Sequence, residues 1–134
     1  QTSKPLELLR IDLIGPAIVQ SLGGMKYILV VVDDFTRYTW VVLLKDKSEA
    51  TDKMIHLCKK LQVEKNILIA WIRSDHGREF ENSKLISFCN DQGTKQEFFA
   101  PKTPQQNGVV ERKNRVIQEM ARVMLNDKNM PKSF

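Results

Sequence analysis

The run Ile67–Ile72 places the strongest constraint on the fold, because it is apolar on both faces of an extended chain. A strand of this kind is typical of the centre of a sheet that lies between helix layers. The pattern predicts an amphipathic helix on either side of it, the first capped by Ser48 and the second capped by Asn82 or Ser83 and ended by Gly93. These segments indicate an α/β domain.

The remaining elements fix the order in which strands and helices follow one another. Three strands come first, over Leu6–Leu13, Tyr27–Val32 and Tyr38–Leu44, and their short connections predict an antiparallel meander. A short strand over Lys95–Phe99 and a long helix from about 107 to 126 come last. We expect the first and fourth strands to lie side by side. A chain of 134 residues is typical of one domain, so we expect residues 1–134 to form a single unit.

Three acidic residues are placed where this order of elements can bring them together. Asp12 and Asp75 each follow an apolar run, and Glu111 lies near the first turn of the last helix, with 35 residues between it and Asp75. Carboxylates that converge repel one another unless they are protonated or bind cations. Hard oxygen ligands suit Mg²⁺, with Mn²⁺ as a substitute, and a pair of such ions supports displacement at phosphorus. We therefore predict a catalytic site with two metal ions at these acids.

Cations collect beside Glu111. The chain has 21 Lys and Arg against 16 Asp and Glu, which gives a net charge of +5, and Arg112, Lys113 and Arg115 follow Glu111 directly. Gln118 lies on the same helical face as Glu111. A basic helix face next to the acids predicts contacts with the phosphates of DNA. An ordinary solvated helix face is the alternative interpretation of the same residues.

Several segments together resemble a known family. The segments Val31–Arg37, Arg73–Gly77 and Thr103–Arg115, with the spacing of Asp75 and Glu111, resemble the catalytic core of integrases, above all those of Ty1/copia-type long-terminal-repeat retrotransposons. The resemblance implies a ribonuclease H-like fold, with a five-stranded mixed sheet flanked by helices. It also implies a polynucleotidyl transferase that trims the 3′ ends of element DNA and joins them to target DNA.

The resemblance carries further expectations. It implies that the polar loop containing Gln106 and Asn107 belongs to the active site and contacts DNA. It also implies that the chain is part of a larger polyprotein, that the full-length protein is a homo-oligomer, and that it acts on chromosomal DNA in the nucleus of the cell. Two other functions fit the same residues: a non-catalytic, integrase-derived DNA-binding module, and a ribonuclease H-like nuclease that only hydrolyses.

The chain departs from the family pattern at three positions. Arg10 stands where we expect His, Arg78 stands where a second Gly often follows Gly77, and Phe99 replaces a small polar residue. Arg10 shares a strand face with Asp12, so it could compete with a metal for that carboxylate. Arg78 could strain its loop if the backbone there required a positive φ.

For most of the remaining cysteine, histidine, aspartate and tryptophan residues we expect structural roles. We expect Cys58 and Cys89 to be buried free thiols, and the two cysteines and two histidines give no recognisable zinc spacing. Asp33 and Asp34 are placed for a turn. We expect His56 to be structural or solvated, and His76 to be either an exposed loop residue or a contact with substrate or a metal-bound water. We expect Trp40 and Trp71 in the core. The free thiols favour an intracellular protein. No run of about 18 apolar residues is present, so we expect no membrane span, and no Gly-rich ATP loop is present.

Overall fold

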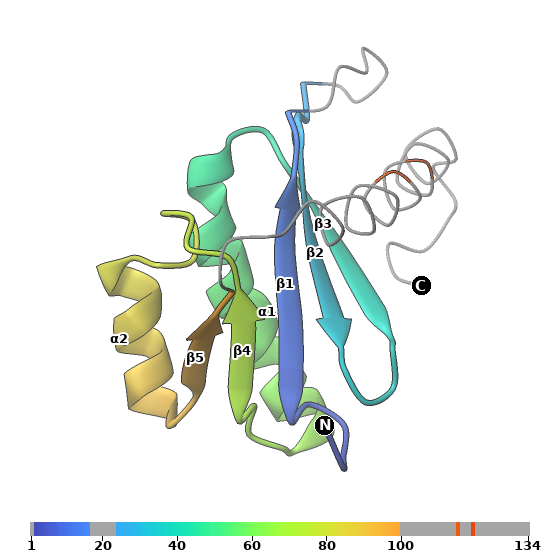
Figure 1. Cartoon of the computed structure of the whole chain (residues 1–134), viewed down its shortest axis with the longest axis vertical. Helices are drawn as coiled ribbons and strands as arrows, with labels where there is room; N and C mark the ends of the chain where they lie inside the picture. The colour runs from blue at the N-terminus through green and yellow to red at the C-terminus, as the bar shows by residue number, and fades with distance from the viewer. Residues whose placement is uncertain (1, 17–23, 100–114, 116–118, 120–134) are drawn as a thin grey trace.

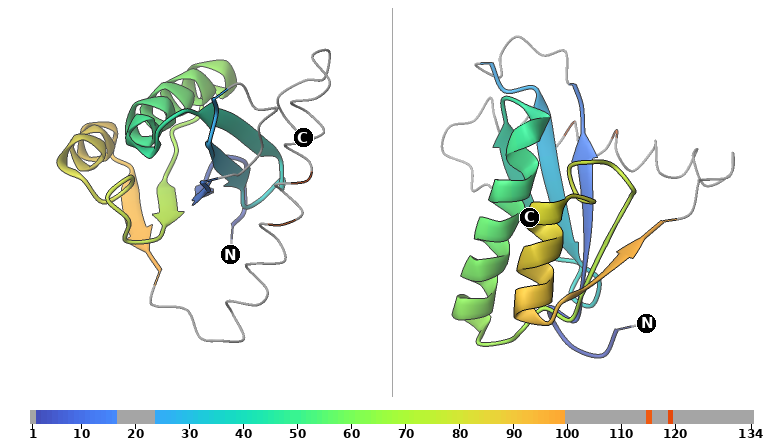
Figure 2. Two further views of the ribbon diagram at one scale, coloured as in Figure 1. Left: turned by 90° about the horizontal axis from the view of Figure 1, so that it is seen from above. Right: turned by 90° about the vertical axis from the view of Figure 1, so that its left-hand side faces the viewer.

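The computed structural model describes residues 2–16, 24–99, 115 and 119. Five strands form one mixed sheet in the order β3-β2-β1-β4-β5. Helices α1 (Ala50–Lys65) and α2 (Ser83–Gln92) pack on the same face of this sheet (Figures 1 and 2). This confirms the predicted α/β fold with a five-stranded mixed sheet. No helix in the described ranges is long and apolar enough to cross a membrane.

The antiparallel half of the sheet is the predicted meander. Strands β1 (Leu8–Ile14), β2 (Tyr27–Asp33) and β3 (Thr39–Leu44) pair in sequence, with Asp12 opposite Val30 and Val30 opposite Val41. β1 begins later than expected, because Leu6 has a φ of +62° and donates its N–H to the Asp33 carboxylate instead of joining the strand.

The parallel half confirms that the first and fourth strands are neighbours. Strand β4 (Trp71–Ser74) runs parallel to β1, with Leu8 aligned to Trp71 and Arg10 to Arg73, and β5 (Lys95–Phe98) runs parallel to β4. The predicted bounds of the fourth strand were wrong, since strand pairing starts only at Trp71.

The prediction that this segment is covered on both faces was also wrong. Ile69 and Ile72 are buried, but Leu68 is 64% exposed and Trp71 is 37% exposed. Trp71 is therefore not a core residue, and Lys95 Nζ lies over its ring, 5.3 Å from the centroid. Trp40 does pack against the core, as expected.

Local capping signals define both helices. Asp46, and not Ser48, is the N-cap of a short 3-10 helix, η2 (Lys47–Glu49), and it forms a reciprocal capping box with Glu49 that leads into α1. Asn82 caps α2 by accepting from the N–H of Leu85, and Gly93 ends it with a φ of +74°. The two signals predicted for α2 are confirmed.

The main core lies between the sheet and the helices. Its sheet-side members come from alternating positions of the central strands and its helix-side members from one face of each helix: Leu9, Ile11, Leu29, Val31, Ile72, Met54, Leu57, Leu61 and Leu85. Cys58 and Cys89 are buried free thiols within it, and burial raises the pKa of the Cys58 thiol to about 12. A second cluster covers the opposite face of β1, β2 and β3: Ile14, Ile28, Val30, Val32 and Val41.

Candidate active site

Asp12 lies inside β1 and not at its end, since Leu13 and Ile14 continue the strand. Its side chain is on the sheet face opposite the helices, because Ile11 on one side of it belongs to the main core and strand residues alternate between faces. The side chain is partly buried beside the second apolar cluster, where Val30 is its cross-strand partner. The strand backbone therefore holds this carboxylate at a fixed position.

Asp75 directly follows β4 and is exposed. Its Oδ1 accepts a hydrogen bond from the Gly77 N–H at 2.8 Å, which forms an Asx turn and orients the carboxylate. A Cβ at Gly77 would lie 3.0 Å from this oxygen and would also collide with the Glu79 carboxylate. The missing side chain of Gly77 thus leaves room for both carboxylates in the turn after β4.

The parallel pairing brings Asp12 and Asp75 to equivalent positions on neighbouring strands. Arg10 and Arg73 are the last aligned pair, and each aspartate lies two residues further along its own strand direction. Neighbouring strands are about 4.8 Å apart. Two acids with 62 residues between them in the sequence therefore lie near the carboxyl ends of two neighbouring strands.

The third predicted ligand, Glu111, lies outside the described residues. The same holds for five predicted DNA-binding residues, which are Gln106, Asn107, Arg112, Lys113 and Gln118. Arg115 is described, and it has a helical backbone and an exposed side chain. This agrees with the predicted helix at that position, while the predicted contact of Arg115 with DNA stays a prediction.

Asp12 and Asp75 are suited to a hard divalent cation. Within the described ranges, no group of three or more His, Cys, Asp or Glu side chains is arranged to hold a metal ion. The two carboxylates are nevertheless the oxygen ligands that Mg²⁺ and Mn²⁺ prefer, and Mg²⁺ commonly binds through one or two carboxylates plus waters and substrate phosphates. The donor chemistry of the two aspartates fits the predicted cofactor, while the role of Glu111 as a further ligand stays a prediction.

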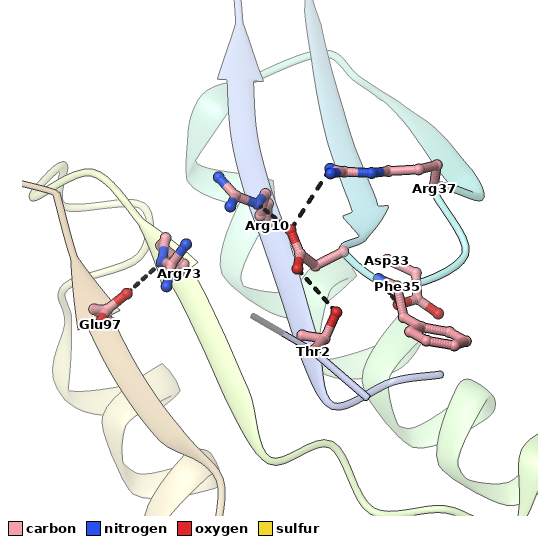
Figure 3. A network of polar contacts seen from close by, with 8 residues as sticks. Thr2, Arg10, Asp33, Phe35, Arg37, Arg73 and Glu97 are labelled. Atoms are coloured by element: carbon pink, nitrogen blue, oxygen red, sulfur yellow. Dashed lines mark hydrogen bonds and ion pairs between the residues drawn. The ribbon is translucent and has the colours of Figure 1, made fainter. Parts of the chain in front are cut away.

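Arg10 has a carboxylate partner that the sequence analysis missed. Its Nε donates to Asp34 Oδ1 at 2.7 Å, and Arg37 Nη1 lies 3.6 Å from the same oxygen (Figure 3). The hydrogen bond from Arg10 holds the pKa of the Asp34 carboxyl below its ordinary value. Arg10 was predicted to compete with a metal ion for the Asp12 carboxylate. In the structure its Nε binds Asp34.

Asp33 and Asp34 fasten the beginning of the chain to the β2–β3 turn. Asp33 is buried and accepts from the N–H groups of Leu6 and Phe35, at 3.2 and 3.0 Å, and Asp34 accepts from the Thr2 hydroxyl at 3.0 Å. The predicted turn role is confirmed for Asp33 through its bond to Phe35. The contacts with Thr2 and Leu6 are long-range and no sequence signal indicated them.

Arg73 also pairs with an acid on the neighbouring strand. Its Nε donates to Glu97 Oε1 on β5, its aligned neighbour (Figure 3). Arg10 and Arg73 each stand two residues before one of the two aspartates, a spacing that marks the two arginines but does not indicate their acidic partners. The sequence analysis treated Arg10 only as a departure and gave Arg73 no role.

His76 is held beside Asp75 by two contacts. Its Nδ1 lies 2.9 Å from Glu81 Oε1, and its ring stacks on Phe98 with centroids 5.0 Å apart. The ring is still largely exposed, so both of the predicted roles remain open to it. His56 on α1 is exposed, as expected.

The other two departures from the family pattern are accommodated by the fold. Within the described ranges, the non-glycine residues with positive φ are Leu6, Arg37 and Asn66, so the strain predicted for Arg78 is absent. Phe99 donates its N–H to the Ser74 carbonyl at 2.8 Å and is partly buried, which continues the pairing of β4 with β5.

Sequence comparison identifies the family of this fold and its paired aspartates. Residues 2–104 match the integrase core domain (rve), and the chain belongs to this family. The retrovirus-related Pol polyprotein of transposon TNT 1-94 from Nicotiana tabacum is 36% identical over 129 residues, which is 96% of this chain and 10% of that protein. That of transposon RE2 from Arabidopsis thaliana is 35% identical over 133 residues, 99% of this chain and 9% of that protein. The chain thus spans about a tenth of these relatives.

Solved structures agree on the fold. The catalytic core of HTLV-2 integrase, solved in complex with magnesium in a trimeric form, superposes with a TM-score of 0.64 at 20% identity, over 95% of this chain and 77% of that one. The catalytic core of BIV integrase gives a TM-score of 0.59 at 21% identity, over 90% and 72% of the two chains. The ribonuclease H-like fold and the retrotransposon integrase family are therefore both confirmed.

Proposed function

We propose that this chain is the catalytic core of a retrotransposon integrase, which processes the 3′ ends of element DNA and joins them to target DNA. The observation that carries the proposal is the alignment of β1 with β4, because Asp12 and Asp75 each lie two residues beyond the last aligned pair, Arg10 and Arg73. Family membership supports the reaction class, since integrase cores act on DNA phosphodiesters. The relatives that share the sequence are Pol polyproteins of plant transposons.

Asp12, Asp75 and Glu111 would hold two Mg²⁺ or Mn²⁺ ions. The magnesium complex of the HTLV-2 core supports this cofactor for the family fold. When bound, such ions supply the Lewis acidity that in-line displacement at phosphorus needs. Since the two aspartates are fixed by a strand and by an Asx turn, the protein contributes a rigid, preorganised pair of ligands.

The chain's own residues do the remaining positioning. The Gly77 N–H holds the Asp75 carboxylate through a hydrogen bond, and the stack on Phe98 keeps His76 next to it. Gln106, Asn107, Arg112, Lys113, Arg115 and Gln118 would bind DNA along the last helix and the loop before it. The full-length protein would act as a homo-oligomer on chromosomal DNA in the nucleus.

The test is reversal of strand joining on a branched DNA substrate, with Mg²⁺ or Mn²⁺. We expect the 134-residue chain to resolve the branch only with metal, and Asp12→Asn, Asp75→Asn and Glu111→Gln to abolish the reaction. Asp91→Asn, an exposed acid on α2, is the matched control and should keep parental activity.

Two results would replace the proposal by one of its alternatives. Metal-dependent hydrolysis of DNA or of an RNA–DNA hybrid without any strand exchange would identify a nuclease. DNA binding without metal-dependent chemistry, unaffected by the three acid substitutions, would identify a non-catalytic binding module.

A further inference from the structure

Two arginines lie side by side next to the paired aspartates. Arg10 on β1 and Arg73 on β4 are aligned partners of neighbouring parallel strands. Both side chains are on the sheet face opposite the helices, since their neighbours Leu9 and Ile72 belong to the main core. They are 39% and 25% exposed, so a ligand can reach them.

Each guanidinium of the pair is bound by an acidic side chain, Asp34 for Arg10 and Glu97 for Arg73. Like charges at directly aligned strand positions are unfavourable. Arg10 donates its Nε to Asp34 and Arg73 donates its Nε to Glu97, and Figure 3 shows Arg73 lying between Glu97 and Arg10. The two carboxylates thus flank the arginine pair and fix the orientation of long side chains that would otherwise be mobile.

The arrangement leaves the Nη groups of both arginines for a further partner within the described part of the chain. A guanidinium presents several N–H donors in a planar fork, and the contacts of Arg10 with Asp34 and of Arg73 with Glu97 both use Nε. An anion that carries several oxygens can accept from two such forks at once. Phosphate is the anion that arginine forks match best.

We propose that Arg10 and Arg73 form a subsite for a backbone phosphate of DNA, adjacent to the phosphate that reacts at Asp12 and Asp75. Each arginine precedes its aspartate by two residues, which is about 7 Å along a strand and suits a neighbouring phosphate of the same DNA strand. The position of this subsite next to the reacting phosphate rests on the proposed function, whereas the phosphate contact itself does not. Arg10 and Arg73 are thus positioning residues that set the register of the DNA.

Asp34 and Glu97 have two opposing effects in this proposal. They preorganise the guanidiniums, which lowers the entropy lost when DNA binds. Their negative charges also oppose the phosphate. Asp34→Asn and Glu97→Gln keep an oxygen that can accept from Nε and remove only the charge, so these changes should strengthen DNA binding.

The experiment measures the affinity of the 134-residue chain for a fluorescent DNA duplex of arbitrary sequence, in EDTA, at several salt concentrations. Arg10→Gln with Arg73→Gln should weaken binding at least about tenfold, since charge-assisted hydrogen bonds are lost. The slope of log affinity against log salt should become shallower by about one unit, as expected for one phosphate contact. Asp34→Asn with Glu97→Gln should change affinity in the opposite direction.

Matched controls separate a local contact from net charge. Lys53→Gln with Lys60→Gln removes two positive charges from α1, and Glu64→Gln with Asp91→Asn removes two negative charges from the helices. These exposed residues lie on the helical layer, so their effects should be much smaller. Equal shifts from the controls would overturn the proposal, and so would equal DNA affinity of the parent and the double arginine variant.

A conservative variant covers the case in which the double glutamine variant does not fold. Arg10→Lys with Arg73→Lys keeps both charges and removes the planar forks, so it should keep the salt slope and still lose affinity. Unchanged affinity would contradict the subsite. Because binding is measured without metal or turnover, loss of this effect leaves the catalytic proposal intact, and an inactive chain with the effect present leaves the subsite intact.

Discussion

The two faces of the sheet differ in what they bury. The helix-covered face carries the main apolar core, and Leu9, Leu29 and Leu44 on it are fully buried. The opposite face carries a smaller apolar cluster over β1, β2 and β3, and beside it stand the charged residues Arg10 on β1, Arg73 on β4 and Glu97 on β5. Asp12 stands where these two parts meet. One face therefore supplies most of the stability, and the other carries the charges of the proposed DNA contact.

The largest effect should come from the helix-covered face. Leu29→Ala removes a fully buried side chain from the centre of the sheet, and we expect a loss of about 2 to 5 kcal/mol in the free energy of unfolding. Leu43→Ala makes the same change on the opposite face, where the side chain is only partly buried, and should lose clearly less. Urea unfolding of both variants measures the difference. Equal losses would contradict the unequal roles of the two faces.

A smaller effect should come from the buried acid at the end of β2. Asp33→Asn cannot accept from both the Leu6 and Phe35 N–H groups, so one buried donor loses its partner, at about 1 to 3 kcal/mol. Asp46→Asn is the control, because asparagine caps a helix as well as aspartate does. The same unfolding measurement applies, and a control variant as unstable as Asp33→Asn would refute the assignment.

The smallest effect is a pH dependence at the charged part of the opposite face. Arg10 lowers the pKa of Asp34 in the folded state below its ordinary value of 3.8. The stability that Asp34 contributes is therefore present above that value and is lost as the pH falls through the lower, folded pKa. Asp34→Asn should flatten the fall of the melting temperature below about pH 4. Parallel curves for parent and variant would show that the ion pair does not contribute.

The predictable part of the fold is the part set by local patterns. The meander, the Asn82 cap, the Gly93 end and the buried thiols follow from residues close in sequence, and the structure confirms them. The start of β4 was wrong because pairing with β1, and not apolarity, decides where a strand begins. The prediction that Trp71 lies in the core was wrong for a related reason. Its burial depends on which elements cover the sheet face opposite the helices.

The candidate site could be predicted only in outline. The spacing of Asp75 and Glu111 and the motifs around them indicated the family, and the order of elements indicated that β1 and β4 are neighbours. The Arg10–Asp34 and Arg73–Glu97 pairs join residues 24 positions apart in each case, and they depend on the exact register of the strands. No local pattern carries that register, so the sequence analysis missed both.

The most direct test of the central claim, that Asp12 and Asp75 form a divalent-metal site and not a structural contact, is a set of melting curves with and without Mn²⁺. A metal that binds only the folded chain raises its melting temperature. We expect that rise in the parent and in Asp91→Asn, and its loss in Asp12→Asn and Asp75→Asn. Without metal, these two variants should be as stable as the parent or more so, since one of two neighbouring negative charges is removed. Lower stability without metal, together with an unchanged response to Mn²⁺, would contradict the claim.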